Sequence, residues 1–136
     1  MSQENVELAH RVVDAFNQRD LDALLALMDD DVEGVPPLAS IEGRYHGHAG
    51  VRRWWESLFS GLSDFTVEVI EVRDLGDLTV ALLRNRAHGT VSNAPVEERL
   101  WFVGEWREGK ATWWQSFRTE AEALEAAGLR EQRDTA

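Results

Sequence analysis

The stretch that decides the fold runs from Leu78 to Arg118 and contains three β-patterned segments: LTVALLRNRAH (78–88), VEERLWFVGEWR (96–107) and ATWWQSFR (111–118). The two-residue period of a strand places six residues of the first segment on one face: Leu78, Val80, Leu82, Arg84, Arg86 and His88. This face is apolar at one end and cationic at the other. The later segments add four of the six tryptophans. A curved sheet lined by Trp, Arg and His predicts a ligand pocket.

Tight-turn signals join these segments into a meander. Strands are predicted at residues 65–73, 78 to about 90, 96–107 and 111–118. Turn residues lie between them at 74–77, 92–95 and 108–109. The spacing therefore predicts four antiparallel neighbours in one sheet.

Helical periodicity dominates the first half of the chain. One helix is predicted from Ser2 to about Gln18, and a second over residues 21–28 behind an Asp20 cap. A third helix carries an apolar stripe at helical spacing, made by Val51, Trp54, Trp55, Leu58 and Leu62.

Two further elements complete the pattern. A short strand at residues 32–35 is stopped by Pro36-Pro37. Thr119 with Glu122 forms a capping box for a last helix, which Gly128 ends. This order of elements predicts an α+β fold with helices packed on one side of a bent sheet, in a single domain over residues 1–136.

Composition narrows the class of protein. The 136 residues carry a net charge of −11, which disfavours nucleic acid and anionic membranes as partners, and no cysteine, which excludes thiolate chemistry. No apolar run reaches the roughly 18–20 residues of a membrane span, and no signal-peptide pattern is present. The single lysine, Lys110, lies in a predicted turn, so Schiff-base chemistry is excluded. A cytoplasmic protein with a small-molecule ligand is expected.

Four short motifs, in order along the chain, resemble one known family. They are VVDAFNQRDLDAL (12–24), YHGHAGVR (45–52), WREGK (106–110) and EALEAAGL (122–129). Together they resemble the SnoaL-like branch of the nuclear transport factor 2-like superfamily, also described as cystatin-like cone folds. The resemblance implies a cone-shaped, barrel-like α+β domain. Its strongly bent, mostly antiparallel sheet is wrapped by three helices of the N-terminal half and followed by a short C-terminal helix.

The resemblance leaves the reaction open, because the family includes isomerases, polyketide cyclases, epoxide hydrolases and proteins that only bind or assemble. Ketosteroid isomerases place a basic carboxylate just past a Val-Glu pair on the short strand, where this chain has Gly34 after Val32-Glu33. Epoxide hydrolases of this fold carry an Asp-Arg-Asp set, whose arginine aligns with Arg86 and whose two aspartates align with His88 and Ser116. The chain therefore lacks carboxylates that each of these two reactions needs.

Arg86 and His88 remain as the candidate catalytic pair. Histidine is the side chain that titrates nearest neutrality, so His88 could move a proton while Arg86 holds an oxyanion or carboxylate. The alternative is that these strand-end charges pair with Glu97, Glu98 or solvent. The predicted substrate-binding residues are Trp101, Trp114, Ser116, Arg84, Val32 and Phe16.

The Glu108-Gly109 turn predicts how the last two strands pair. A regular two-residue turn sets Trp101 opposite Ser116. It also sets Val103 opposite Trp114, so these four residues share the pocket face. The other face then holds Phe102, Gly104, Trp106, Trp113, Gln115 and Phe117. Since an exposed aromatic patch marks an interface, a homodimer through the convex face of the sheet is predicted.

No metal or cofactor is expected. The aspartates at 29–31 lack the spacing and the closing glutamate of a calcium loop and indicate a solvated helix end. His46 and His48 lack a third ligand nearby. Two functions stay open: cofactor-free proton transfer or hydration on an apolar, ring-containing substrate, and ligand binding or assembly without catalysis.

Overall fold

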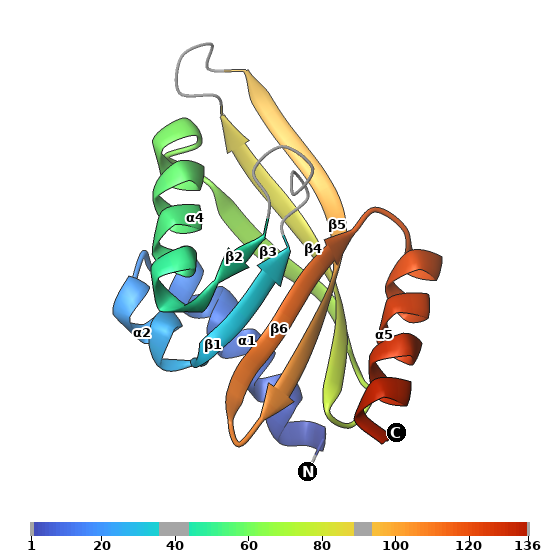
Figure 1. Cartoon of the computed structure of the whole chain (residues 1–136). Coiled ribbons are helices and arrows are strands. Elements are labelled where there is room, and N and C mark those ends of the chain that lie inside the picture. Colours follow the sequence, from blue (N-terminus) through green and yellow to red (C-terminus); the bar gives the residue numbers. More distant parts are fainter. Residues whose placement is uncertain (1, 36–43, 89–93, 136) are drawn as a thin grey trace.

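The computed structural model describes residues 2–35, 44–88 and 94–135, and within these ranges the chain forms one six-stranded sheet with four helices (Figure 1). The strands are β1 (Met28–Val35), β2 (Tyr45–His46), β3 (Thr66–Asp74), β4 (Leu78–His88), β5 (Pro95–Arg107) and β6 (Lys110–Phe117). The helices are α1 (Ser2–Asn17), α2 (Leu21–Ala26), α4 (Gly47–Gly61) and α5 (Glu120–Thr135).

The sheet is mostly antiparallel, and its strand order is β2-β1-β6-β5-β4-β3. Strands β3 to β6 form the predicted meander of successive antiparallel neighbours. The short β2 pairs antiparallel with β1, whereas β1 runs parallel to β6, to which it is joined by the long connection that a parallel pair needs. The expected α+β cone fold is therefore confirmed.

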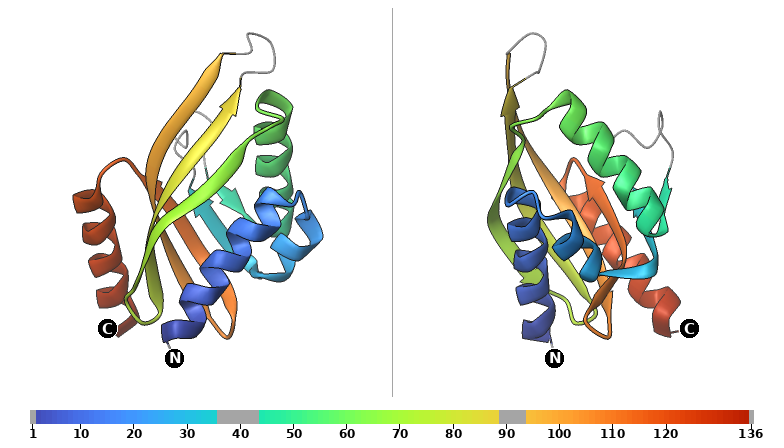
Figure 2. Two further views of the ribbon diagram at one scale, coloured as in Figure 1. Left: turned by 180° about the vertical axis from the view of Figure 1, so that it is seen from behind. Right: turned by 90° about the vertical axis from the view of Figure 1, so that its left-hand side faces the viewer.

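Helices cover both faces of the sheet (Figure 2). Helix α1 packs on β3 and β4, and α2 and α4 pack at the β1 end. Helix α5 packs on β4, β5 and β6 from the opposite side. We call the face toward α1 and α4 the inner face and the face toward α5 the outer face. The prediction that all helices lie on one side is therefore wrong for α5.

Helix α5 is longer than the predicted short C-terminal helix. Its start is as predicted: the Glu122 N–H donates to Thr119 Oγ1 at 3.2 Å, and the Thr119 hydroxyl donates to the Glu122 carboxylate at 3.0 Å. The helix continues through Gly128, however, because residues on both sides of it hold the helix to the sheet. Ala127 is buried in the outer core, and Arg130 lies 4.4 Å from the centroid of a sheet tryptophan.

The region around β1 also differs from the prediction. Helix α2 begins at its Asp20 cap but ends at Ala26, and β1 starts at Met28. The aspartates at 29–31 therefore lie in a strand and do not form a helix end. The two-residue β2 was not predicted, and Pro36-Pro37, Thr90 and the turn residues 92–93 lie outside the described residues.

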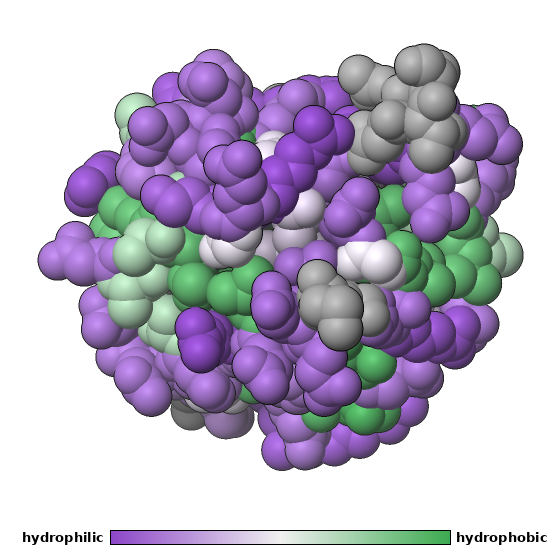
Figure 3. Space-filling model, turned by 90° about the horizontal axis from the view of Figure 1, so that it is seen from below, coloured by the Kyte–Doolittle hydropathy of each residue, from purple (hydrophilic) through white to green (hydrophobic). Residues whose placement is uncertain are grey.

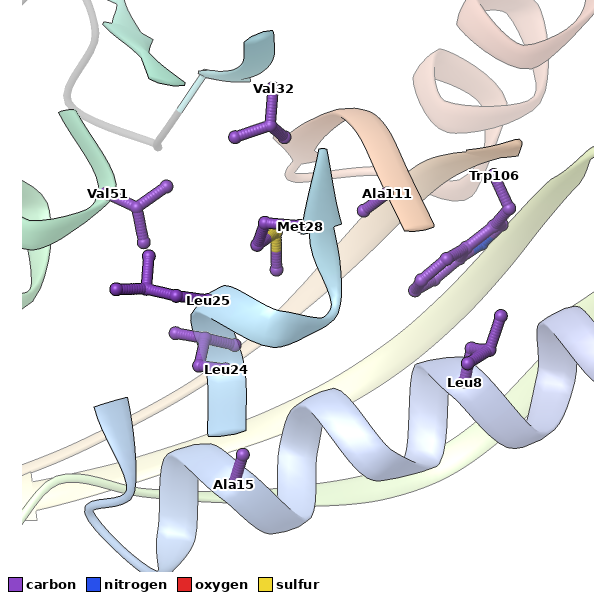
Figure 4. Packing of buried hydrophobic residues seen from close by; sticks show 9 residues of the cluster. All are labelled: Leu8, Ala15, Leu24, Leu25, Met28, Val32, Val51, Trp106 and Ala111. Atoms are coloured by element: carbon purple, nitrogen blue, oxygen red, sulfur yellow. The ribbon is translucent and has the colours of Figure 1, made fainter. Parts of the chain in front are cut away.

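Apolar clusters on the two faces join the layers. The inner cluster, drawn in Figure 4, contains Leu8, Ala15, Leu24, Leu25, Met28, Val32, Val51, Trp106 and Ala111. The outer cluster contains Leu78, Val80, Val103, Trp113, Ala123 and Ala127. Strand β4 is therefore covered on both faces over its first half, since Leu78, Thr79 and Val80 are all buried.

The surface carries few large apolar side chains. Seen from below, it is mostly hydrophilic, with apolar patches between polar ones (Figure 3). The exposed large apolar residues of the described ranges are Ile70, Val96, Leu124 and Leu129. None of the described helices has the length and apolar character needed to cross a bilayer.

Candidate functional site

A cavity of about 540 Å³ lies between the inner face of the sheet and helices α1 and α4. Strands β3 to β6 supply one wall, and the two helices supply the other. Most lining residues are apolar, and the aromatic ones are Phe16, Trp54, Phe65, Phe102, Trp106 and Trp114. A largely apolar cavity of this size falls in the range of small-molecule pockets. We call it the inner pocket.

Two aromatic residues connect the walls of the inner pocket. The ring of Phe16, on α1, lies 5.7 Å from that of Trp54 on α4 and 5.5 Å from that of Phe65. The ring of Trp114, on β6, lies 5.2 Å from Trp54 and 6.2 Å from Phe102. Offset and edge contacts of this kind stabilise aromatic clusters. Phe16 and Trp114, both predicted to bind substrate, therefore line the inner pocket.

Gly34 provides the space that Trp114 occupies. The two residues are partners in the parallel pairing of β1 and β6. A Cβ atom added at Gly34 would lie 2.4 Å from two carbons of the Trp114 indole, well inside van der Waals contact. The indole therefore fills the position where an isomerase would carry its basic carboxylate. The neighbouring Glu33 points to the other side and pairs with Arg44.

Few polar side chains of the described residues reach the inner pocket. They are Ser57, Thr79, Asn85, Glu98 and Arg118. Thr79 Oγ1 accepts a hydrogen bond from Trp106 Nε1 at 3.0 Å. Asn85 is only 7% exposed, and no residue of the described chain hydrogen-bonds to its side chain. Glu98 and Arg118 are exposed and mark the open end of the pocket.

The charged groups of the inner pocket are confined to this open end. Among its described lining residues, only Glu98 and Arg118 carry a charge, and no histidine is present. Glu98 is the register partner of Asn85 across β4 and β5, so the two side chains share the inner face. A carboxylate and an amide at the rim could act on a polar ligand group. The deeper part is suited to an apolar body.

Arg86 and His88 lie on the outer face, away from the inner pocket. The β4 residues that line the pocket are Thr79, Ala81, Leu83 and Asn85. By strand alternation the even-numbered residues point to the other side. The predicted face is therefore wrong. Leu78 and Val80 are buried, as expected for a core face, but they are buried beneath α5.

Two of the outer-face charges of β4, Arg84 and His88, have carboxylate partners. Arg84 lies 3.3 Å from Glu68 and 3.5 Å from Glu97. The His88 N–H donates to Asp64 Oδ1 at 2.8 Å, and the His88 ring nitrogen Nδ1 lies 2.8 Å from Asp64 Oδ2. The backbone hydrogen bond, and next the ring hydrogen bond, hold the pKa of the Asp64 carboxyl below its ordinary value.

A β-bulge changes the predicted pairing of β5 with β6. The turn residues Glu108 and Gly109 have φ angles of 52° and 78°, as a tight hairpin turn requires. The register then shifts between Glu105 and Trp106. Beyond this bulge every pair is displaced by one residue relative to a regular hairpin.

The bulge sorts the aromatic residues onto different faces from those predicted. Trp101 pairs with Phe117 on the outer face and does not reach the inner pocket. Phe102 and Trp106 face the pocket, whereas Trp113 is buried in the outer cluster under α5. The predicted dimer surface of Phe102, Trp106 and Trp113 is therefore not one surface.

Two other predicted binding residues lie beside the inner pocket without lining it. Val32 is fully buried in the inner cluster. Ser116 pairs with Phe102, so it shares the inner face, but its Oγ atom is buried without a hydrogen-bond partner. Neither residue offers an accessible group to a ligand.

The histidines near β2 contact the aspartates of β1. His48 Nε2 lies 3.0 Å from the Met28 carbonyl oxygen, which ties the start of α4 to β1, and 3.9 Å from the Asp30 carboxylate. His46 Nε2 lies 4.0 Å from the Asp31 carboxylate. Across the described ranges, no group of three or more His, Asp or Glu side chains is arranged to hold a metal ion.

Asn85 is the pocket residue that sequence reasoning overlooked. It alternates with the apolar residues Leu83 and Ala87 on the less polar face of β4. A single amide in an otherwise apolar row was the available signal.

Comparisons with known proteins agree with this architecture. The sequence profile of the SnoaL-like domain matches residues 9–114. A nuclear transport factor 2-like protein of unknown function from Burkholderia pseudomallei has a similar structure, with a TM-score of 0.77, 21% identity, and coverage of 90% of this chain and 95% of that chain. No functionally curated protein matches the chain.

Two further solved structures contain ligands. TerC, co-crystallised with polyporic acid, has a TM-score of 0.77 and 22% identity over 90% of this chain and 96% of that chain. A Catenulispora acidiphila protein of ketosteroid isomerase-like fold, in complex with trimethylamine, has a TM-score of 0.74 and 16% identity over 90% of this chain and 92% of that chain. At these identities the likeness concerns the fold. Because the domain profile covers most of the sequence, the chain belongs to the SnoaL-like domain family.

Proposed function

We propose that this protein binds an apolar, ring-containing small molecule in the inner pocket. The observation that carries the proposal is the cavity of about 540 Å³ with its largely apolar, aromatic lining. Burial of apolar ligand surface supplies the affinity in such a pocket, and aromatic side chains favour flat rings. The structures of TerC with polyporic acid and of the trimethylamine complex support a small organic ligand.

The proposal can be tested with 1-tetralone, a compact two-ring ketone, as the probe. Ala81 lines the pocket and is 7% exposed, so Ala81→Phe places a ring inside the cavity. We expect isothermal titration calorimetry to show saturable binding to the wild-type protein and binding at least about 10-fold weaker in Ala81→Phe.

The matched control adds the same ring elsewhere. Ile70 of β3 is 40% exposed and does not line the pocket, so Ile70→Phe is expected to keep wild-type affinity. His88→Ala is also expected to keep it, since His88 lies on the outer face. Equal binding by wild type and Ala81→Phe would mean that the probe binds outside the inner pocket.

A second candidate function is proton transfer at the open end of the pocket. Glu98 is the carboxylate that lines it, and Asn85 lies opposite Glu98 in register. A carboxylate could remove a proton next to a ligand carbonyl while an amide stabilises the enolate oxygen. Exchange of the α-protons of 1-tetralone in D₂O, followed by NMR, would test this.

The carboxylate variants make that test specific. Glu98→Gln should abolish the protein-catalysed exchange, whereas Glu97→Gln should not, because Glu97 faces outward and pairs with Arg84. Exchange no faster than in buffer would leave the protein as a binding protein.

We also propose that the outer face joins two copies of the chain. Trp101 and Phe117 pack against the outer cluster there and are only partly buried. Arg84 and Glu97 lie on the same face, and neighbouring charges of both signs make a surface self-complementary, as a two-fold interface requires. Analytical ultracentrifugation should show a dimer that Trp101→Asp dissociates. A wild-type monomer at micromolar concentration would contradict the proposal.

A further inference from the structure

Asn85 occupies a distinctive position in the inner pocket. In the β-ladder its register partners are Val67 on β3 and Glu98 on β5. Along β4 its neighbours on the inner face are Leu83 and Ala87, both buried. The amide therefore projects from β4, next to the edge strand β3, at the boundary between the apolar cavity and its charged open end.

The side chain of Asn85 makes no hydrogen bond that would hold the fold together within the described chain. Neither its oxygen nor its nitrogen has a hydrogen-bond partner there, although the residue is only 7% exposed. A nearby asparagine shows the contrast. Asn17 donates to the Val67 carbonyl oxygen at 2.8 Å and accepts from the Val67 N–H at 2.9 Å, so both halves of its amide hold α1 to β3.

The other uncharged polar groups of the pocket are engaged or exposed. Thr79 Oγ1 accepts a hydrogen bond from the Trp106 indole N–H, and Ser57 lines the pocket but is exposed. A primary amide can donate two hydrogen bonds and accept two, and burying it unpaired costs free energy. Asn85 is therefore the pocket-lining amide that a bound ligand can satisfy.

We propose that Asn85 determines ligand specificity by hydrogen-bonding a carbonyl or hydroxyl oxygen on the ring system. The inference rests on the proposed function, since it concerns the same pocket. Glu98 and Trp106 are eight residues apart on β5, roughly 26 Å along a strand. The ligand therefore enters with its apolar end toward Trp106, and its oxygen atom lies beside Asn85, near the open end.

The test compares two probes with one ring skeleton: 1-tetralone, which has a carbonyl oxygen, and tetralin, which lacks it. Leucine has nearly the shape of asparagine, so Asn85→Leu removes the hydrogen bonds and keeps the wall. The ratio of the tetralin Kd to the tetralone Kd should fall about 5- to 10-fold in Asn85→Leu, the range expected for one neutral hydrogen bond. Asn85→Ala, which cannot overfill the site, should lower the ratio in the same direction.

The control is Gln115→Met, which removes an amide from the outer face of the same sheet and should leave the ratio unchanged. If wild type and Asn85→Leu bind both probes with the same ratio, Asn85 does not select the ligand, and the proposed function stands. If the wild-type protein binds neither probe, the proposed function itself fails, and the role of Asn85 fails with it.

Discussion

Gly34 and Trp114 show how one missing side chain decides what a site can do. The indole covers the α-carbon of the glycine, so a carboxylate could be restored at residue 34 only if the tryptophan moved. The aromatic wall of the inner pocket and an isomerase-like base therefore exclude each other in this chain. Ligand binding by aromatic contact is consistent with that exchange.

This packing predicts that Gly34→Ala destabilises the fold. The added methyl would lie 2.4 Å from the Trp114 ring, and overpacking of this kind costs about 1–3 kcal/mol. Chemical denaturation should show a lower midpoint with an unchanged slope. In the Gly34→Ala background, Trp114→Phe should recover part of the loss, because the smaller ring leaves room.

Gly61 provides the comparison for that substitution. It is the last residue of α4, and nothing lies within 4 Å of a Cβ atom added there. Gly61→Ala should therefore leave stability unchanged or raise it by up to about 1 kcal/mol, through the lower entropy of the unfolded chain. Equal losses at both positions would show that Trp114 is not the cause.

The pair formed by Asp64 and His88 predicts a pH dependence. The folded-state pKa of Asp64 lies below its ordinary value of 3.8, so its carboxylate stabilises the fold above that value. The stabilisation is lost as the pH falls through the ordinary value and then through the lower folded-state value. Asp64→Asn should therefore lower the Tm at pH 7, and the difference from wild type should shrink toward acid pH.

Asp77→Asn is the control for this titration, because the exposed Asp77 side chain makes no such contact among the described residues. Its Tm should follow that of the wild type across the pH range. A constant deficit for Asp64→Asn from pH 7 down to acid pH would show that the charge of Asp64 does not contribute.

At the scale of elements, periodicity and turn chemistry predicted most of the fold. Strands β3 to β6 follow from alternation and from the turn residues between them, and the Thr119 capping box sets the start of α5. The bulge at Glu105 and Trp106 has no comparable signal, because it depends on how the hairpin packs between α1 and α5. One extra residue there reversed the assignment of Trp101.

The site was harder to predict than the fold for a related reason. Residue alternation along a strand predicts that its two faces differ. It does not predict which helix covers which face. The apolar run of Leu78, Val80 and Leu82 indicated a buried face, and α5 is the element that buries its first part. Asn85 lies on the opposite face from Arg86 and His88, so the sequence predicted a pocket with a different polar group.

An ion pair between Arg130 and Glu105 attaches α5 to the sheet. Glu105, 3% exposed, accepts hydrogen bonds from Arg130 at 3.0 Å and from Thr112 at 2.7 Å. Arg130→Met keeps a long side chain beside Trp113 and removes the guanidinium charge that pairs with a buried carboxylate. We expect a loss of about 3 kcal/mol in the free energy of unfolding, measured by chemical denaturation.

Two further variants separate the charge from the packing. Glu105→Gln in the Arg130→Met background should recover part of the loss, because a neutral amide needs no cation. Arg52→Met on the exposed side of α4 should change stability by less than about 0.5 kcal/mol. A loss in Arg130→Met that Glu105→Gln does not relieve would assign the effect to the packing on Trp113.

At the scale of the whole molecule, the two faces of the sheet differ in packing. Helix α5 covers the outer face of the sheet at the first half of β4. The inner face stays open around a cavity of about 540 Å³. A fold that keeps such a cavity gives up part of the packing that would otherwise stabilise it. Ligand binding restores contacts on the inner face, so stability and occupancy should be linked.

This linkage predicts opposite effects of Asn85→Leu on the free and the bound protein. Without ligand, the variant replaces a pocket amide that has no hydrogen-bond partner in the described chain with an apolar group of similar shape, so it should gain about 1 kcal/mol and a higher Tm. At a 1-tetralone concentration of about 100 times the wild-type Kd, the wild-type protein should gain about 2.7 kcal/mol. The variant should gain less, because it binds the ketone more weakly. Differential scanning calorimetry with and without the probe measures both quantities, and Gln115→Met should behave as wild type in each. A lower Tm for ligand-free Asn85→Leu would mean that the amide stabilises the empty pocket, and that the fold rather than the ligand requires it.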